Sequence, residues 1–210
     1  MKYDFDLEDK SKKRKKLILR ILLILVEIIL TVLLAYAITH YGLERMTVSG
    51  EYMSPTLLDG DEILIDRMRY RAFPIRRNDI VVVQHNGSEH NYYTIERVIG
   101  MPGEKIRIEE GEVYINGKKL KEKYDFPKME NGGLALEEIT IEEDEYFMLC
   151  DNRNECEDSR NANIGNVHKQ NIIGKAWLRT NSFALISHID GSAKQKKSEK
   201  SDDKQSEKTN

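Results

Sequence analysis

The sequence predicts a mainly β protein: one domain of antiparallel sheets, sandwich-like or barrel-like, preceded by a single N-terminal transmembrane helix. Three observations predict it: a long apolar run at 17–39, many short β-branched runs after residue 46, and little helical periodicity elsewhere. The 210 residues suffice for one domain plus attachments. A net charge of −3 gives no basic signal for nucleic acid, so none is expected as a partner.

Residues 1–16 form a polar tail that we expect to lack fixed structure. The tail ends in the basic cluster Lys12–Lys16, directly before the apolar run. Basic residues beside a transmembrane helix mark its cytoplasmic side. This tail is therefore expected in the cytoplasm.

The apolar run is 23 residues long, and as a helix it reaches about 35 Å, enough to cross a hydrocarbon core of about 30 Å. Sixteen of its residues are Leu, Ile or Val, which outweigh the cost of the one central charge, Glu27. Glu27 is either tolerated in the bilayer or in contact with a partner helix. Ala35-Tyr36-Ala37 resembles a cleavage site, but the run exceeds a signal-peptide core of roughly 7–15 residues, which favours an uncleaved anchor.

The chain from 46 to 188 reads as one extracytoplasmic β domain. Short β-branched or alternating runs predict its strands at 62–66, 79–84, 92–99, 105–109, 112–116, 145–149 and 175–179. Gly111 separates two of these runs as in a hairpin, and Asn116-Gly117 is a strong turn signal. The acidic stretch 119–143 reads as a mobile insertion, and the polar residues 189–210 read as a disordered tail.

Four motifs follow the apolar run in a fixed order. They are V-S-G-E-Y-M-S-P-T-L at 48–57, R-N-D-I-V-V at 77–82, E-R-V-I-G-M-P-G-E at 96–104 and C-D-N-R-N-E-C-E-D-S-R at 150–160. Together they resemble the motifs S-M-x-P, R-G-D-I-V, K-R-V-I-G-L-P-G-D and G-D-N-R-x-x-S-x-D-S-R of the type I signal peptidase (leader peptidase) family. The resemblance covers about residues 17–182. It implies the family's β fold and a membrane-anchored protein that acts on signal peptides of exported proteins.

Both catalytic residues of that family are replaced in this chain. The family's serine nucleophile precedes the methionine of S-M-x-P, where this sequence has Tyr52. Its lysine general base precedes the arginine of K-R-V-I-G, where this sequence has Glu96. A serine attacks a carbonyl only when a base takes its proton, and a tyrosine oxygen lies several ångströms further from the backbone. Ser54 is a poor substitute, because two residues along an extended strand move a side chain about 6–7 Å.

The remaining residues of these motifs are expected to shape the cleft and its scaffold. By resemblance they are Met53, Pro55, Arg97, Cys150, Asp151, Asn152, Arg153, Cys156, Asp158 and Arg160. Cys156 replaces a serine that orients the family's lysine, and Cys150 replaces a glycine. The two cysteines are either buried thiols or a disulfide, and a metal site of Cys150, Cys156 and Glu96 is a weaker alternative. No cofactor or metal is expected, and all five histidines read as surface or structural residues.

The favoured hypothesis is a catalytically inactive signal peptidase homologue. It would bind segments of secreted or surface proteins by strand addition, as a chaperone or assembly factor. By resemblance to family members without the dyad, its partners would include secretion, sortase or pilus components. The alternative is an active signal peptidase with atypical catalytic residues.

Overall fold

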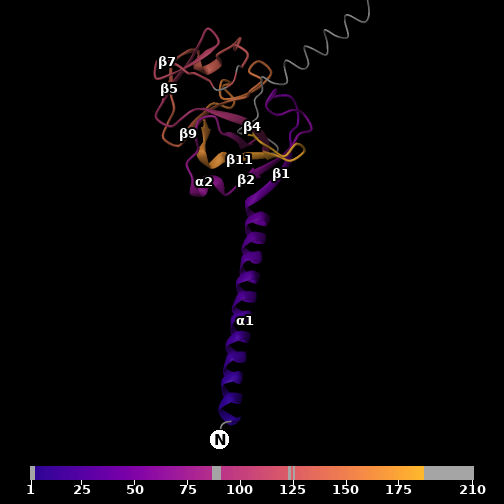
Figure 1. Ribbon diagram of the computed structural model, residues 1–210. Helices are drawn as coiled ribbons and strands as arrows, with labels where there is room; N and C mark the ends of the chain where they lie inside the picture. Colours follow the sequence, from indigo (N-terminus) through magenta and orange to yellow (C-terminus); the bar gives the residue numbers. More distant parts are fainter. Residues whose placement is uncertain (1–2, 87–90, 123, 125, 187–210) are drawn as a thin grey trace, which may run out of the picture. The chain divides into compact units, whose positions relative to one another are not determined.

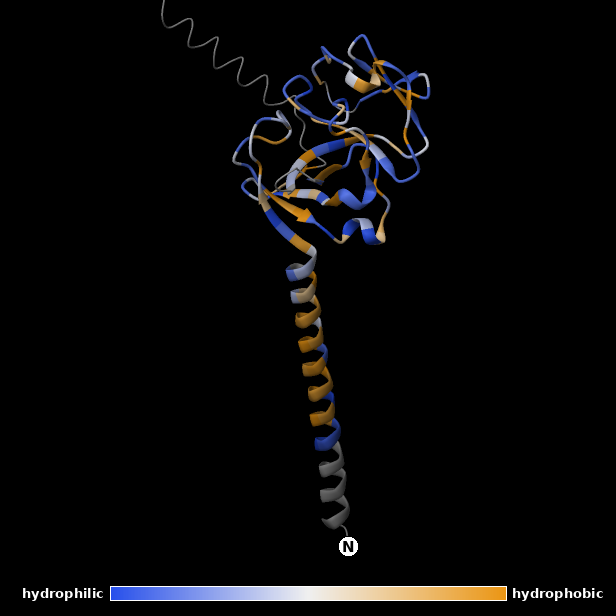
Figure 2. Cartoon of the chain, turned by 180° about the vertical axis from the view of Figure 1, so that it is seen from behind, coloured by the Kyte–Doolittle hydropathy of each residue, from blue (hydrophilic) through white to orange (hydrophobic). Residues whose placement is uncertain are grey.

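The computed structural model describes residues 3–86, 91–122, 124 and 126–186, and the chain divides into two compact units, Met1–Leu43 and Glu44–Asn210. The first unit is one helix, α1 (Tyr3–Gly42) (Figure 1). Its stretch Arg14–Gly42 is long and apolar enough, by length and composition, to cross a membrane. Most residues of this stretch are hydrophobic, coloured orange in Figure 2, and their large apolar side chains are exposed.

The helix begins earlier than the sequence predicts. Residues 3–16 are helical instead of lacking fixed structure. The physical reason is composition: no glycine or proline occurs before Gly42, and Lys, Leu, Glu and Arg are good helix formers. The basic cluster at residues 12–16 therefore lies on the same helix as the apolar run.

The described residues of the second unit form two antiparallel sheets, which confirms the mainly β prediction. The larger has the strand order β1-β2-β11-β3-β4-β9-β10, with β12 paired to β11, and the smaller has the order β7-β6-β5-β8. The strands of the larger sheet are β1 (Leu43–Thr47), β2 (Glu62–Asp66), β3 (Ile80–Asn86), β4 (Asn91–Gly100), β9 (Glu145–Leu149), β10 (Val167–His168), β11 (Ile172–Arg179) and β12 (Ala184–Leu185). Those of the smaller sheet are β5 (Lys105–Glu109), β6 (Glu112–Ile115), β7 (Lys118–Lys119) and β8 (Ile139–Thr140). Three short helices complete the described part of the unit: α2 (Arg69–Ala72), η1 (Gly133–Leu136) and η2 (Lys169–Asn171).

The strands predicted from β-branched and alternating runs are present. The hairpin at Gly111 is confirmed by the register Ile108↔Val113 between β5 and β6. Asn116 and Gly117 both have positive φ and join β6 to β7, as the turn signal predicts. The alternation of apolar and polar residues therefore predicts these strands.

The stretch 119–143 is packed against the domain, so its interpretation as a mobile insertion is wrong. It contains β8 and η1, and Met129, Ala135 and Ile141 are buried in the core that the smaller sheet covers. The stretch is mostly polar and acidic, and its buried apolar residues are too far apart in the sequence to form a recognisable pattern. The predicted disordered tail at 189–210 lies outside the described residues.

Candidate functional site

The motif at 48–57 forms a loop of turns between β1 and β2. Met53 points into the core and is buried, whereas Tyr52 is 53% exposed. The Tyr52 ring lies against Gly50, where an added Cβ would come within 2.7 Å of the ring carbon Cε2. Asn152 fixes the loop: its N–H donates to the Tyr52 carbonyl at 3.0 Å, and its Nδ2 donates to the Glu51 carbonyl at 3.3 Å. Asn152 thus fixes the backbone at Tyr52, and the exposed Tyr52 ring packs against Gly50.

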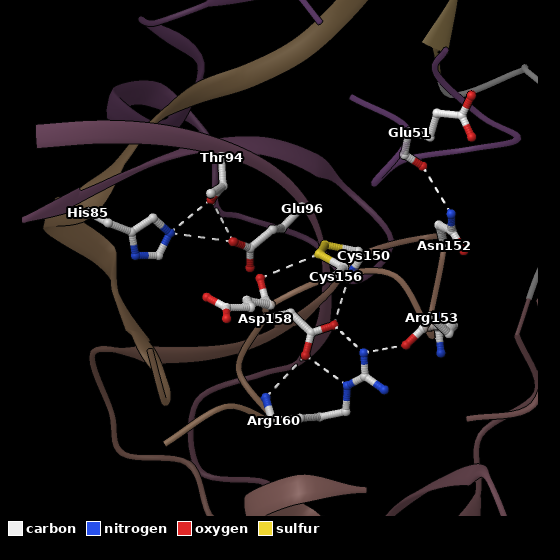
Figure 3. Close-up of a disulfide and its surroundings, with 11 residues drawn as sticks. Glu51, His85, Thr94, Glu96, Cys150, Asn152, Arg153, Cys156, Asp158 and Arg160 are labelled. Atoms are coloured by element: carbon white, nitrogen blue, oxygen red, sulfur yellow. Dashed lines mark hydrogen bonds and ion pairs between the residues drawn. A yellow bond between two sulfur atoms is a disulfide. The ribbon is translucent and has the colours of Figure 1, made fainter. Parts of the chain in front are cut away.

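Glu96 lies on β4 and is fully buried. Its Oε1 accepts a hydrogen bond from the Thr94 hydroxyl at 2.6 Å. The His85 ring nitrogen Nε2, on the neighbouring strand β3, lies 2.8 Å from the same hydroxyl and 3.4 Å from Glu96 Oε1. Oε2 of Glu96 has no hydrogen-bond partner among the described residues. Figure 3 shows the three side chains turned toward one another.

Arg97, the next residue of β4, points to the other side of the strand. Its guanidinium makes two hydrogen bonds to the Asp151 carboxylate, Nε to Oδ1 at 2.6 Å and Nη2 to Oδ2 at 2.5 Å. The Thr56 hydroxyl donates to the same carboxylate, and Tyr124 and Phe126 cover the guanidinium. Burial lowers the pKa of Arg97, but the hydrogen bond and charge of Asp151 outweigh it and raise that pKa above its ordinary value. Arg97 is therefore a charged structural residue.

The last motif forms a second buried network beside the first. Arg160 donates from Nε and Nη2 to the Asp158 carboxylate at 2.8 and 2.9 Å. The same carboxylate accepts the Cys150 N–H at 3.2 Å. Arg153 pairs with Glu122 at 2.5 Å, which ties the stretch 119–143 to this motif. These side chains hold the loop after β9 in place (Figure 3).

Cys150 and Cys156 form a disulfide, one of the two interpretations that the sequence leaves open. It connects the end of β9 to the loop that carries Asp158, across a Cα–Cα distance of 6.2 Å. The two sulfurs and an Asp158 oxygen lie within 4.8 Å of one another. Because the sulfurs are bonded to each other, neither is the thiolate that a metal ion requires. In the view of Figure 3 the disulfide lies on the side of Glu96 opposite His85.

A cleft of about 500 Å³ brings several of these residues together. It is lined by the β1 end, the 48–53 loop, the first half of β4 and the disulfide: Met46, Thr47, Val48, Ser49, Gly50, Tyr52, Met53, Tyr92, Tyr93, Thr94, Ile95, Cys150, Cys156, Glu157 and Ile164. Pairing with β9 covers only Arg97–Gly100, whereas residues 91–96 pair with β3 alone among the described strands. The cleft therefore adjoins a free strand edge.

One expectation about the site is corrected. Residues 52–56 form turns, not an extended strand, because the Ser54 N–H bonds the Glu51 carbonyl at 3.0 Å; Ser54 and Pro55 do not line the cleft. His85, expected to be a surface or structural residue, contacts Thr94 and lies beside Glu96, which agrees with a structural residue. Only the register of β3 on β4, which places His85 opposite Tyr92, reveals this approach.

Comparisons with known proteins agree with the motifs. The family model described as signal peptidase, peptidase S26, matches residues 21–180. Signal peptidase I T of Bacillus subtilis is 33% identical over 154 residues, 70% of this chain and 78% of that relative. Signal peptidase I of Leptolyngbya laminosa is 36% identical over 157 residues, 71% of this chain and 74% of that relative. A crystal structure of a signal peptidase I from Enterococcus faecalis, 28% identical, covers 49% of this chain and 97% of its own, with a TM-score of 0.39.

Proposed function

The chain belongs to the signal peptidase family, peptidase S26, and we propose that it holds extended segments of exported proteins in its cleft without cutting them. This membership confirms the resemblance drawn from the four motifs. The apolar helix and the relatives fit a membrane-anchored protein. We propose that the basic end of α1 lies in the cytoplasm and the β domain outside.

The observation that carries this proposal is the pair Tyr52 and Glu96, at the positions of the family's serine and lysine. Amide hydrolysis by the family's route needs a short hydroxyl beside a base. Tyr52 is exposed, and its ring lies against Gly50. Glu96 is buried and bonded to Thr94. The hydroxyl and the base of that route are both missing.

The free edge of β4 supports the binding part of the proposal. An extended peptide that pairs with residues 91–96 would run along the cleft and alternate its side chains between the cleft and solvent. The buried pair of Arg97 and Asp151 keeps this strand in place. The clients we propose are segments of secreted and surface proteins, held during secretion or during assembly of structures such as pili.

Photo-crosslinking tests this proposal directly. Full-length protein in detergent, carrying benzoylphenylalanine in place of Tyr93, is illuminated with a precursor of an exported protein. Tyr93 lines the cleft, so a crosslink to an uncut precursor is expected. The same substitution at Phe183, an exposed residue outside the cleft lining, is the matched control and should give no crosslink.

Two outcomes count against the proposal. Removal of the signal peptide by the wild-type protein would contradict binding without cutting. Equal crosslinking from positions 93 and 183 would contradict binding in the cleft.

A second candidate function is signal-peptide cleavage with atypical residues. It has the support of the relatives, which are named signal peptidases. One structural observation also favours it: Thr94 lines the cleft, and its hydroxyl contacts both His85 and Glu96. A hydroxyl beside an imidazole and a carboxylate is the arrangement of an activated nucleophile.

Cleavage by this route depends on Thr94. If wild-type protein cuts a precursor, Thr94→Val, which keeps the shape of the side chain and removes the hydroxyl, should abolish cutting. Thr180→Val, at a hydroxyl outside the cleft lining, is the control and should cut normally. Cleavage that survives Thr94→Val would exclude Thr94 as the nucleophile.

A further inference from the structure

Three tyrosines line the cleft: Tyr52, Tyr92 and Tyr93 are 53%, 47% and 53% exposed. Tyr92 and Tyr93 are neighbours on β4, so their rings leave opposite faces of the strand, and the Tyr92 ring stacks on His85. Tyr93 shares its face of β4 with Ile95, which packs against the core cluster that contains Met53. A cation is attracted to the face of an aromatic ring, and the stem of a long basic side chain packs on apolar surface. The cleft therefore suits a lysine or arginine side chain.

The charge of the cleft also favours a basic side chain as its ligand. Among the described residues that line the cleft, Glu157 is the only Asp, Glu, Lys or Arg. Within the part of the chain that the structure describes, the Glu157 carboxylate has no hydrogen bond or ion pair. Its negative charge is available to a ligand.

Position 96 lies behind Thr94, which lines the cleft, and does not itself line it. In the family this position holds a lysine that serves as the general base. Here Glu96 places a carboxyl group there, and its Oε2 has no partner among the described residues. The replacement therefore puts an acidic side chain in place of a basic one behind this wall.

We propose that the cleft selects extended segments that place a lysine or arginine side chain in it. This inference rests on the proposed function, in which the cleft holds such segments. The aliphatic stem lies along Met53 and Ile95, the rings of Tyr52 and Tyr93 lie beside the charged end, and Glu157 pairs with it. Glu157 is then the residue that determines specificity.

Peptide binding to the full-length protein in detergent tests the preference. Fluorescent seven-residue peptides differ only at the central position, which is Lys, Arg, Met or Glu, and fluorescence anisotropy gives the Kd of each. The Lys and Arg peptides should bind at least about 5-fold more tightly than the Met peptide, and the Glu peptide should bind most weakly. A peptide with the lysine moved to its last residue keeps the same charge and should bind like the Met peptide.

Matched variants identify the acidic partner. Glu157→Gln should bring the Lys peptide to the affinity of the Met peptide for the same variant. Glu155→Gln, an exposed acid in the same loop outside the cleft lining, should keep the full preference.

The results can separate a failure of this inference from a failure of the proposed function. Equal affinity for the Lys and Met peptides, or a preference that survives Glu157→Gln, would overturn this inference while leaving segment binding intact. Binding of none of the peptides, nor of an exported-protein precursor, would overturn the proposed function as well.

Discussion

Arg97 and Asp151 form a buried ion pair between β4 and the loop that carries the disulfide. Asp151→Asn removes the negative charge and leaves the Arg97 guanidinium buried without an anionic partner. Loss of one partner of a buried pair costs about 3–5 kcal/mol, and we expect that decrease in the free energy of unfolding. Urea denaturation of the β domain, followed by the fluorescence of Trp177, measures it.

The exposed pair of Lys105 and Glu138 gives the control for that measurement. Glu138→Gln should change the free energy of unfolding by less than about 1 kcal/mol, because solvent screens this pair. If the two variants were equally stable, Asp151 would not have the structural role that its contacts indicate.

At the residue scale, the resemblance of the short motifs predicts that Tyr52 and Glu96 occupy the nucleophile and base positions, because they directly precede Met53 and Arg97. The contacts of Glu96, in contrast, do not follow from the motifs. His85 lies outside every motif, and it reaches Glu96 only because β3 pairs with β4 in one register. The polar cluster around Glu96 could therefore not be predicted from the sequence.

At the element scale, Asp61 connects the loop before β2 to the turn after β11. Its carboxylate accepts the Leu58 N–H at 2.9 Å, Asn181 Nδ2 at 2.9 Å and Arg179 Nη1 at 3.1 Å. Burial by itself raises the pKa of Asp61, but these hydrogen bonds and the Arg179 charge outweigh burial and hold the pKa below its ordinary value. The ionised carboxylate therefore stabilises the fold.

Asp61→Asn should lower stability in a pH-dependent way. Because the folded pKa lies below the unfolded one, the stabilisation is complete above about pH 4 and is lost as the pH falls through the folded pKa. We expect the variant to be about 1–2 kcal/mol less stable at pH 7, with a smaller difference at pH 3. Urea denaturation of both proteins at the two pH values checks this, and a difference independent of pH would refute it.

The disulfide is a second connection at this scale. It closes a short loop, with a sequence separation of 6 residues. Loop-closure entropy gives about 2 kcal/mol for so short a loop. A reductant should therefore lower the melting temperature of the wild-type protein and leave that of the Cys150→Ala/Cys156→Ala variant unchanged. Reaction of the unreduced wild-type protein with a thiol reagent would contradict the disulfide.

Among the elements, regular alternation predicted β5 and β6, because each of their inward residues packs on one face. Alternation did not predict the packed structure of the stretch 119–143. Met129, Ala135 and Ile141 are too far apart in the sequence to form a periodic pattern, yet all three are buried. Turns at 52–56 were also missed, since their hydrogen bonds leave no apolar signature.

At the scale of the whole molecule, the division at residues 43 and 44 separates the apolar helix from the β domain. A variant that begins at residue 44 keeps both sheets except the first residue of β1. We expect it to stay in solution, while the full-length protein floats with phospholipid vesicles in a density gradient. Equal flotation of both proteins would show that α1 is not the anchor.

Our central proposal is that the cleft still holds a precursor without cutting it, while Tyr52 and Glu96 stand in place of the family's nucleophile and base. The most direct test is cleavage of an exported-protein precursor by the Tyr52→Ser/Glu96→Lys double variant beside the wild type, both full length in detergent. We expect no cleavage by the wild type and cleavage at the end of the signal peptide by the variant. Cleavage by the wild type would contradict the claim, because the unaltered site would then possess a working nucleophile.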